Sequence, residues 1–491
     1  MIRKNKLIAL WMWLAICLPL SAQLPGSETS QVMTVAQYFD LVLSNHPIAQ
    51  QVRLDNKIAQ AAILKARGAF DPKVGWKDGG KTLSGVSYYE AQSSYLTVPT
   101  WFGIELTAGR DQITGTNVDP SQKTPDQGLY YAGISIPLGA GFWINERMAE
   151  LKKAKIAQTQ TQAEQVLAYN ELLFRASQAY GNWIAAHQKL NLYDQMQANA
   201  ELRLAGVQQQ VLQGDKPEIE RLEASIVVQN RNLQREQAKI ELIKKTLEVS
   251  NFLWDEQGRP LVLAPELIPE DSLDEVLERW LVIEGIDVAQ TVLNHPKMDY
   301  LRAKIAESQV DRKLLRDAIK PQVNFNYQRL STEAVVPQNW MDNNNQVAGL
   351  TVQIPLLWRK ERGGIQSIQA KIEQQQWNLA YTQQEWTNEI TGQIQQVASL
   401  ETQFELNQAI AEDYKTLLNA EQTKWSYGES SLFLVNTREN SYIDAQINRL
   451  SLGAFLWEAK AKTIKDLAWF VTAIPPQKAP LLGPQPVELD R

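Results

Sequence analysis

The spacing of hydrophobic residues changes several times along the chain, and each change predicts a different kind of element. Residues 47–68 carry apolar side chains at helical spacing, with Asn45 as the expected N-cap and Pro47 in the first turn. Over 71–138, and again over 321–356, hydrophobic and polar residues alternate with a period of two, which predicts strands with one apolar and one polar face. Two blocks of strands are therefore expected, each preceded by a helix.

Very long helices are predicted after the two strand blocks. Residues 145–213 and 362–427 contain no Pro and almost no Gly, so each is expected to form one helix of roughly 100 Å at about 1.5 Å per residue. A glycine-containing turn ends each one, and shorter helices are expected to return over 218–254 and 432–469. We expect each returning helix to stack end to end with the helix before the strands, and this stack to lie beside the long helix.

These elements occur twice in the same order. Asn45-His46-Pro47 recurs as Asn294-His295-Pro296, and nine of the thirty residues from 45 to 74 are identical at a constant offset of 249. Such self-similarity predicts two tandem copies of one structural unit. The expected organisation is a signal peptide (1–22), a first repeat (23–254), an inter-repeat equatorial segment (255–293), a second repeat (294–469) and a Pro-rich C-terminal tail (470–491).

The first segment indicates export. A basic start, an apolar run over 7–20 and a small-residue cleavage site at Ala22 predict a secretory signal peptide. Cys17 would be the attachment site of a lipoprotein instead, but the preceding Ile16 is not the small residue that such signals require. Cleavage would remove the one Cys and three basic residues, which shifts the formal charge from −6 to −9. No later stretch approaches the roughly 18 apolar residues of a spanning helix, so an exported chain that crosses a membrane must do so with strands.

Composition excludes several classes of function. The 491 residues include 3 His and 1 Cys, too few for a metal site or a catalytic triad. The net charge of −6 gives no basic footprint for nucleic acid, and there is no nucleotide-binding loop. We therefore expect no enzyme activity, no cofactor and no nucleic-acid partner.

Aromatic residues gather near the ends of the predicted strands. Amphipathic rings at strand ends are typical of the aromatic girdles of outer-membrane barrels. The alternative is that they fill the core of a soluble sandwich, although the polar alternate face and the export signal favour lipid. The predicted membrane-interface aromatics are Trp76, Tyr89, Trp101, Tyr131, Trp143, Trp340 and Trp358.

Several features, none specific alone, occur together in one order. They are the export signal, the two copies, the Asn-x-Pro helix starts, strands that end in Ile-Pro-Leu before an Arg-bearing helix, and the turn Tyr-Gly-Glu-Ser-Ser-Leu-Phe-Leu-Val at 427–435. Over about 34–469 the chain thereby resembles the TolC-like outer-membrane efflux proteins. The resemblance implies a mainly α fold with a membrane β-barrel part. It also implies a homotrimer in which each chain gives four strands to a shared 12-stranded barrel, continued by a periplasmic α-helical barrel.

The first strand block departs from this pattern. The span 72–138 is about twice as long as the second block, and it contains an extra alternating stretch over 104–108. The extra length predicts either an elongated external hairpin or additional strands.

The resemblance also implies a function and partners. The expected function is a passive exit duct in the outer membrane of a Gram-negative bacterium, serving a tripartite efflux or type I secretion system. Its partners would be outer-membrane lipid, a periplasmic adaptor (membrane fusion) protein and an inner-membrane RND or ABC pump. The alternative is a periplasmic coiled-coil structural or adaptor protein whose strands form a soluble domain.

The resemblance implies that the glycine turns lie at a periplasmic tip where the pore is gated. The family commonly places acidic residues after the second turn, but the matching positions here are Leu434 and Thr437. A plain solvated or packing role is the alternative for every gate candidate. The remaining candidates are Trp425, as an aromatic gate partner, and Glu218, Glu220, Glu429 and Glu439 as sources of charge.

Overall fold

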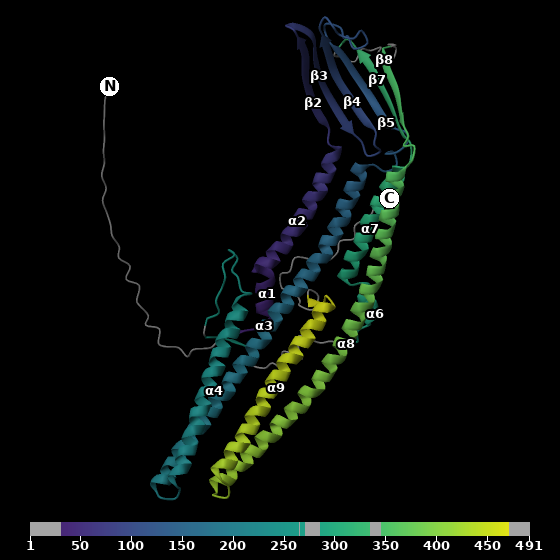
Figure 1. Cartoon of the computed structure of the whole chain (residues 1–491). Coiled ribbons are helices and arrows are strands. Elements are labelled where there is room, and N and C mark those ends of the chain that lie inside the picture. The colour runs from purple at the N-terminus through teal and green to yellow at the C-terminus, as the bar shows by residue number, and fades with distance from the viewer. Residues whose placement is uncertain (1–30, 265, 271–284, 334–344, 471–491) are drawn as a thin grey trace, which may run out of the picture.

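Two very long helices carry a β-sheet at one end of the molecule (Figure 1). The computed structural model describes residues 31–264, 266–270, 285–333 and 345–470. Helix α3 (Glu146–Leu212) has 67 residues and α8 (Arg359–Ser426) has 68, so each is about 100 Å long at about 1.5 Å per residue. The predicted signal peptide and Trp340 lie outside the described residues, as does the predicted tail beyond Phe470.

Shorter helices line the two long ones. Helices α2 (Pro47–Arg67) and α4 (Glu218–Ser250) contact α3, one near each end, while α7 (Pro296–Asp317) and α9 (Leu432–Asp466) contact α8 in the same way (Figure 1). Each long helix and the shorter helices beside it form a column. Both α7 and α9 also contact α3, and these contacts join the two columns. Small elements lie near the middle of the columns: α1 (Val35–Asn45), α6 (Val288–Leu293), and a parallel pair of β1 (Gln31–Met33) with β6 (Leu267–Pro269). The short helix η1 (Gly68–Phe70) follows α2 at the sheet end.

None of the helices that the structure describes combines the length and the apolar character needed to cross a membrane.

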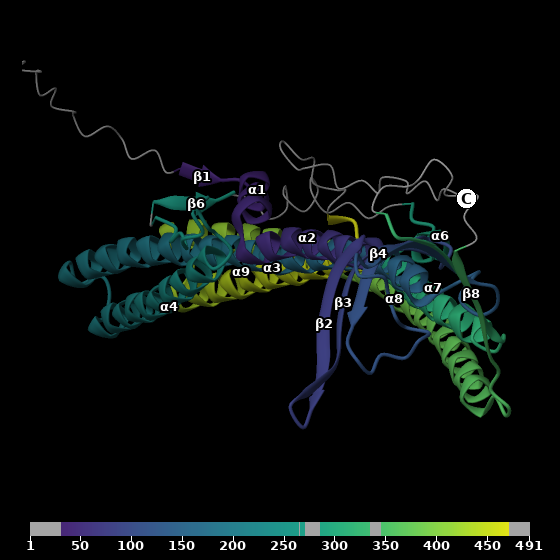
Figure 2. The same ribbon diagram turned by 90° about the horizontal axis from the view of Figure 1, so that it is seen from above.

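The sheet has six antiparallel strands in the order β2-β3-β4-β5-β7-β8. Figure 2 shows β2 and β8, the two edge strands, on opposite sides of it. The strands are β2 (Lys73–Leu83), β3 (Val86–Pro99), β4 (Glu105–Thr114), β5 (Leu129–Pro137), β7 (Gln322–Ser331) and β8 (Gln346–Gln353).

The expectation of four strands per chain is wrong for the described sheet, which has six. The stretch 104–108 forms the start of β4, and the chain before it folds into the further hairpin β2–β3. Ser84 and Gly85 form the two-residue loop with φ of 53° and 79°, the positive values that a tight hairpin turn requires. The extra length of the first block is therefore two additional strands in the same sheet.

The main core joins the columns near their middle. Tyr180 and Trp183 of α3 are buried there with Trp457 of α9. The Trp457 indole donates a hydrogen bond to the Ser177 carbonyl at 2.8 Å. Its ring lies against Gly181, where a Cβ atom would come within 2.5 Å of it. The glycine therefore permits this contact between α3 and α9.

Two histidines cap the helices that lead to the sheet. His46 Nδ1 accepts from the Ile48 amide at 3.2 Å, and His295 Nδ1 accepts from the Lys297 amide at 3.1 Å. The expected cap Asn45 instead donates to the Trp254 carbonyl at 3.0 Å. A ring nitrogen can accept only when it is unprotonated, so both caps require neutral imidazole. Burial lowers the pKa of His46, and it lowers that of His295, which is 2% exposed, to about 4.

Replacing Gly181 by Ala should destabilise the protein by about 1–3 kcal/mol, because the new methyl group overlaps the buried Trp457 indole. The matched control is Gly206→Ala in the same helix, where nothing lies within 4 Å; it should stabilise by up to about 1 kcal/mol. Thermal unfolding of both variants measures the difference. Equal midpoints would contradict the described Trp457 contact.

His295 should make folding sensitive to acid. Its folded pKa of about 4 lies below the unfolded value of 6.5, so the unfolded state binds the proton first. The stability contribution is present above pH 6.5 and falls by up to about 3 kcal/mol as the pH drops to 4. Denaturant unfolding of the wild type and of His295→Asn, which retains a capping side chain without titrating, should diverge below pH 6.5. Parallel losses in the two proteins would refute this role.

Candidate functional site

The register of the sheet gives it one apolar and one polar face. Because successive side chains point to opposite faces, pairing fixes which residues share a face across all six strands. On one face, called the apolar face, the half nearest the helices carries Val74, Trp76, Leu96, Val98, Leu106, Ala108, Ile134, Ile136, Phe325, Tyr327, Leu350 and Val352. The outer half of the same face carries polar and charged side chains, among them Asp78, Glu90, Arg110 and Arg329. The polar face comprises Lys73, Lys77, Lys81, Ser93, Thr97, Thr107, Asp111, Ser135, Asn324, Asn326, Gln328 and Thr351.

The apolar face is open. Val74 is 85% exposed and Leu350 is 62% exposed, and the apolar half of the face extends from β2 to β8. Contiguous apolar surface of this extent is typical of a membrane or partner contact. In addition, β2 and β8 each have a single neighbour in the sheet, so both edges present unpaired backbone amides and carbonyls.

Four of the predicted interface aromatics lie toward the end of the sheet nearest the helices. Trp101, in the β3–β4 turn, stacks on Phe70 with ring centroids 5.4 Å apart. Trp358 precedes α8 and donates to the Ile319 carbonyl at 3.0 Å. Trp143, which follows β5, is 73% exposed, and Trp76 lies on the apolar face. These tryptophans lie at the level where strands meet helices.

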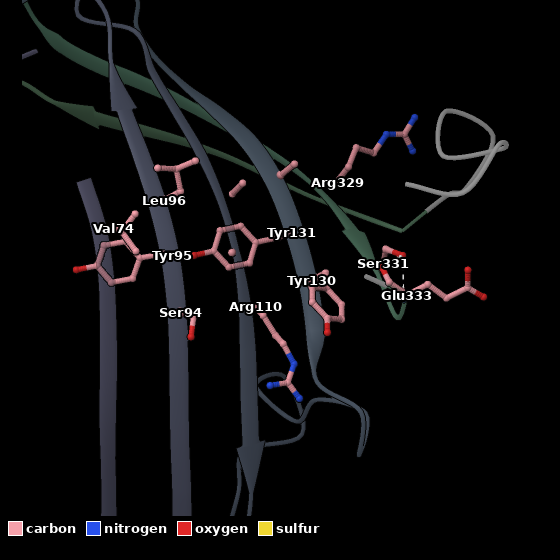
Figure 3. Close-up of a pocket in the computed structure, with 13 residues that line it drawn as sticks. Val74, Ser94, Tyr95, Leu96, Arg110, Tyr130, Tyr131, Arg329, Ser331 and Glu333 are labelled. Atoms are coloured by element: carbon pink, nitrogen blue, oxygen red, sulfur yellow. Dashed lines mark hydrogen bonds between the residues drawn. The ribbon is translucent and has the colours of Figure 1, made fainter. Parts of the chain in front are cut away.

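Tyr89 and Tyr131, two further predicted interface aromatics, lie on the polar face, opposite to Trp76. Tyr131 covers Gly109, where a Cβ would be 2.6 Å from its hydroxyl, and Tyr95 covers Gly75, where a Cβ would be 2.3 Å from its ring. Figure 3 shows the Tyr95 and Tyr131 rings beside each other across the strands. Tyr131 and the apolar Ile134 are an odd number of residues apart, so their opposite orientation follows from the strand period.

Two glycine turns form the other end of the molecule. Gly214 and Gly428 have φ of 81° and 80°. The amides that follow them bond back to the Gln210 and Lys424 carbonyls, both at 2.9 Å. Each turn is a Schellman-type helix ending, for which a left-handed glycine is the usual residue.

The predicted gate residues are divided between surface and interior. Glu429, Leu434 and Thr437 are exposed. On α4, Glu218 forms an ion pair with Arg221, and Glu220 with Lys216 at 2.7 Å. Trp425 is partly buried against a cluster of Val207, Ala224 and Leu432, which brings the ends of the two columns together.

Glu439 is enclosed instead. Its side chain is fully buried between Arg203 of α3 and Arg231 of α4, with the Arg231 Nε at 3.2 Å from the carboxylate. Arg231 also donates to Asn440 at 2.5 Å and to Gln234 at 2.8 Å. In this arrangement Glu439 cannot line an aperture; it joins α9 to α3 and α4. The sequence gives no signal for this triad, because Arg231 and Glu439 are 208 residues apart.

Helix α4 carries a second unpartnered surface. Its buried residues Ala224, Arg231 and Ala238 recur every seven positions on one side. On the other side an exposed stripe, the α4 stripe, also recurs every seven: Ile219, Ile226, Leu233, Ile240 and Leu247. Helix α8 exposes Leu406, Ile410 and Leu417 at four- and seven-residue spacing. Heptad spacing of this kind is typical of helices that pack against further helices.

Within the described residues, no group of three or more His, Cys, Asp or Glu side chains is arranged to hold a metal ion.

Comparison with known proteins identifies the fold. The sequence matches no protein-family model and no curated protein. Among solved structures, the open-state MtrE outer-membrane channel of Neisseria gonorrhoeae is similar at TM-score 0.64 and 13% identity, over 88% of both chains. CusC, solved in a study of its folding and transmembrane channel formation, is similar at 0.61 and 14%, over 88% of this chain and 91% of CusC. The outer-membrane protein VceC of Vibrio cholerae is similar at 0.59 and 12%, over 88% and 95%.

The chain therefore has the mainly helical fold of the TolC-like outer-membrane efflux channels. The resemblance predicted from the sequence is confirmed at the level of the fold.

The buried triad should be a major stabilising contact. Replacing Glu439 by Gln leaves two buried guanidinium groups without a counter-charge, and we expect a loss of about 3 kcal/mol in the free energy of unfolding. Glu429→Gln makes the same chemical change at an exposed tip position and should have little effect. Denaturant unfolding of the two variants provides the comparison, and equal stabilities would contradict the described burial of Glu439.

Proposed function

We propose that this protein is the outer-membrane channel of a tripartite efflux or type I secretion system, a passive exit duct that crosses the outer membrane and the periplasm. The observation that carries the proposal is the sheet, whose apolar band near the helices and open edges lie at the end of helices about 100 Å long. A periplasmic structural or adaptor protein, the alternative function, needs no lipid-facing sheet.

Closure of the sheet requires further copies of the chain. Unpaired backbone groups are not tolerated in hydrocarbon, so a spanning sheet must have no free edge. In the proposed homotrimer, β2 of one copy pairs with β8 of the next. The two strands run in opposite directions relative to the helices, as antiparallel pairing demands. Three sheets of six strands give 18 strands, a number at which barrels leave a water-filled channel.

The helices would close in the same way. In the trimer, the α4 stripe of one copy packs against the exposed α8 residues of the next copy, which extends the barrel as a ring of helices. The similar order of elements in the two halves supports tandem repeats as the origin of this ring. The tryptophans at the strand–helix junction would mark the periplasmic interface of the outer membrane.

The far end of the helices is the proposed site of gating and docking. The turns at Gly214 and Gly428 would meet the adaptor protein, which connects the duct to an inner-membrane RND or ABC pump. Leu434 and Thr437 are exposed there and would line the aperture. The Arg203–Glu439–Arg231 triad links α9 to α3 and α4, so its ion pairs would oppose movement of these helix ends relative to one another.

Cell fractionation tests the function directly. The wild-type protein should appear in the outer-membrane fraction, require detergent for extraction and be a trimer. Its described helices are not membrane spans, so this result would point to the strands as the membrane part. Recovery from the periplasm without detergent would instead support the adaptor alternative.

The helix contact between copies has its own test. Leu233→Glu places a charge in the α4 stripe and should shift the detergent-extracted trimer toward monomer. Asn232→Glu, at the adjacent exposed position beside the stripe, should leave the trimer intact. Size-exclusion chromatography with light scattering distinguishes the two. A fully trimeric Leu233→Glu protein would remove the α4 stripe from the proposed interface.

A further inference from the structure

The polar face of the sheet carries a column of lysines on its edge strand. Lys73, Lys77 and Lys81 point to this face from β2, and the residues between them on the same face are Gly75 and Gly79. All three lysines are exposed. Because the intervening positions have no side chain, nothing from β2 itself screens the ammonium groups. Four residues of strand separate successive lysines by about 13 Å.

Carboxylates do not balance this column. Among the described strands, the other charged side chains on the polar face are Glu105 and Asp111, both on β4. Glu105 forms an ion pair with Arg147 of α3. Asp111 accepts a hydrogen bond from the Ser93 hydroxyl at 2.6 Å. Three lysines therefore face one carboxylate without a cationic partner, in a chain whose net charge is −6.

Aromatic rings hold two of the lysines without neutralising them. The Lys77 ammonium lies 5.2 Å from the centroid of the Tyr95 ring, and the Lys81 ammonium lies at the same distance from that of Tyr88. A cation–π contact orients an ammonium group but leaves its charge in place. No ion pair to the three lysines occurs among the described residues.

The column lies where neighbouring copies would meet. In the proposed trimer, β2 lies beside β8 of the next copy, whose polar-face residues Val347, Gly349, Thr351 and Gln353 carry no charge. Each of the three boundaries would therefore present a lysine column to the water-filled interior. Rings of Lys and Arg side chains are the usual device of pores that favour anions.

We propose that the hairpin β2–β3 makes the outer part of the duct attract anions, so that the cargo it favours is anionic, with carboxylate, phosphate or sulfate groups. This inference rests on the proposed function. The hairpin that widens the sheet from four strands to six is then also the element that sets the charge of the exit.

Planar-bilayer recordings of the purified trimer in a KCl gradient test this proposal. The wild-type channel should have a reversal potential closer to the equilibrium potential of chloride than to that of potassium. The triple variant Lys73→Gln, Lys77→Gln, Lys81→Gln should lower the chloride-to-potassium permeability ratio by at least about threefold. The corresponding triple Arg variant should keep the ratio, because it keeps the charge. Asp78→Asn, on the same strand but the opposite face, should also leave it unchanged.

The lysine effect should be larger in about 0.1 M salt than in about 1 M salt, where the screening length falls from about 10 Å to about 3 Å. A conducting wild type without anion preference, or one whose preference survives the triple Gln change, would overturn the lysine proposal and leave the duct in place. A wild-type trimer that forms no channel would overturn the proposed function itself.

Discussion

Backbone hydrogen bonding at the edges of one sheet is the constraint on which the rest of the structure depends. Six strands expose an apolar face, and β2 and β8 each lack a neighbour on one side. In water such edges invite aggregation, and in lipid they cannot exist unpaired. In the proposed trimer, neighbouring copies of the chain pair these edges and close the sheet, and the helices that continue from the strands follow the same symmetry.

The helical part satisfies a related requirement over a much greater length. Each column buries a narrow seam, and α4 leaves a second stripe of heptad-spaced apolar residues uncovered. Two contacts fix the columns within the chain: Trp457 against Gly181 near the middle, and Glu439 between two arginines toward the tip. Both join α9 to α3, so they connect the two halves of the sequence. Long helices without a globular core are stable here because packing is distributed along their whole length.

The sequence predicts what depends on local pattern and misses what depends on register and distance. The long helices follow from the absence of Pro and the scarcity of Gly, and their ends follow from the glycine turns. The resemblance to outer-membrane channels is confirmed at the level of the fold. Four strands per chain came from the resemblance, whereas the described sheet has six; Gly79 and Gly80 interrupt the alternation that would reveal β2. Because side chains alternate along a strand, Tyr131, three residues before the apolar-face residue Ile134, is expected on the polar face. Arg203, Arg231 and Glu439 could not be brought together without the fold, and His46 rather than Asn45 is the cap because its ring nitrogen reaches the free amide.

Electron cryo-microscopy of the detergent-extracted protein tests the central claim most directly, because it counts the strands around the closed sheet. The proposed closure predicts three copies and 18 strands, with β2 of each copy hydrogen-bonded to β8 of the next. A barrel of 12 strands built from β4, β5, β7 and β8, with the hairpin β2–β3 outside the wall, would contradict it. So would a monomer whose sheet edges remain open.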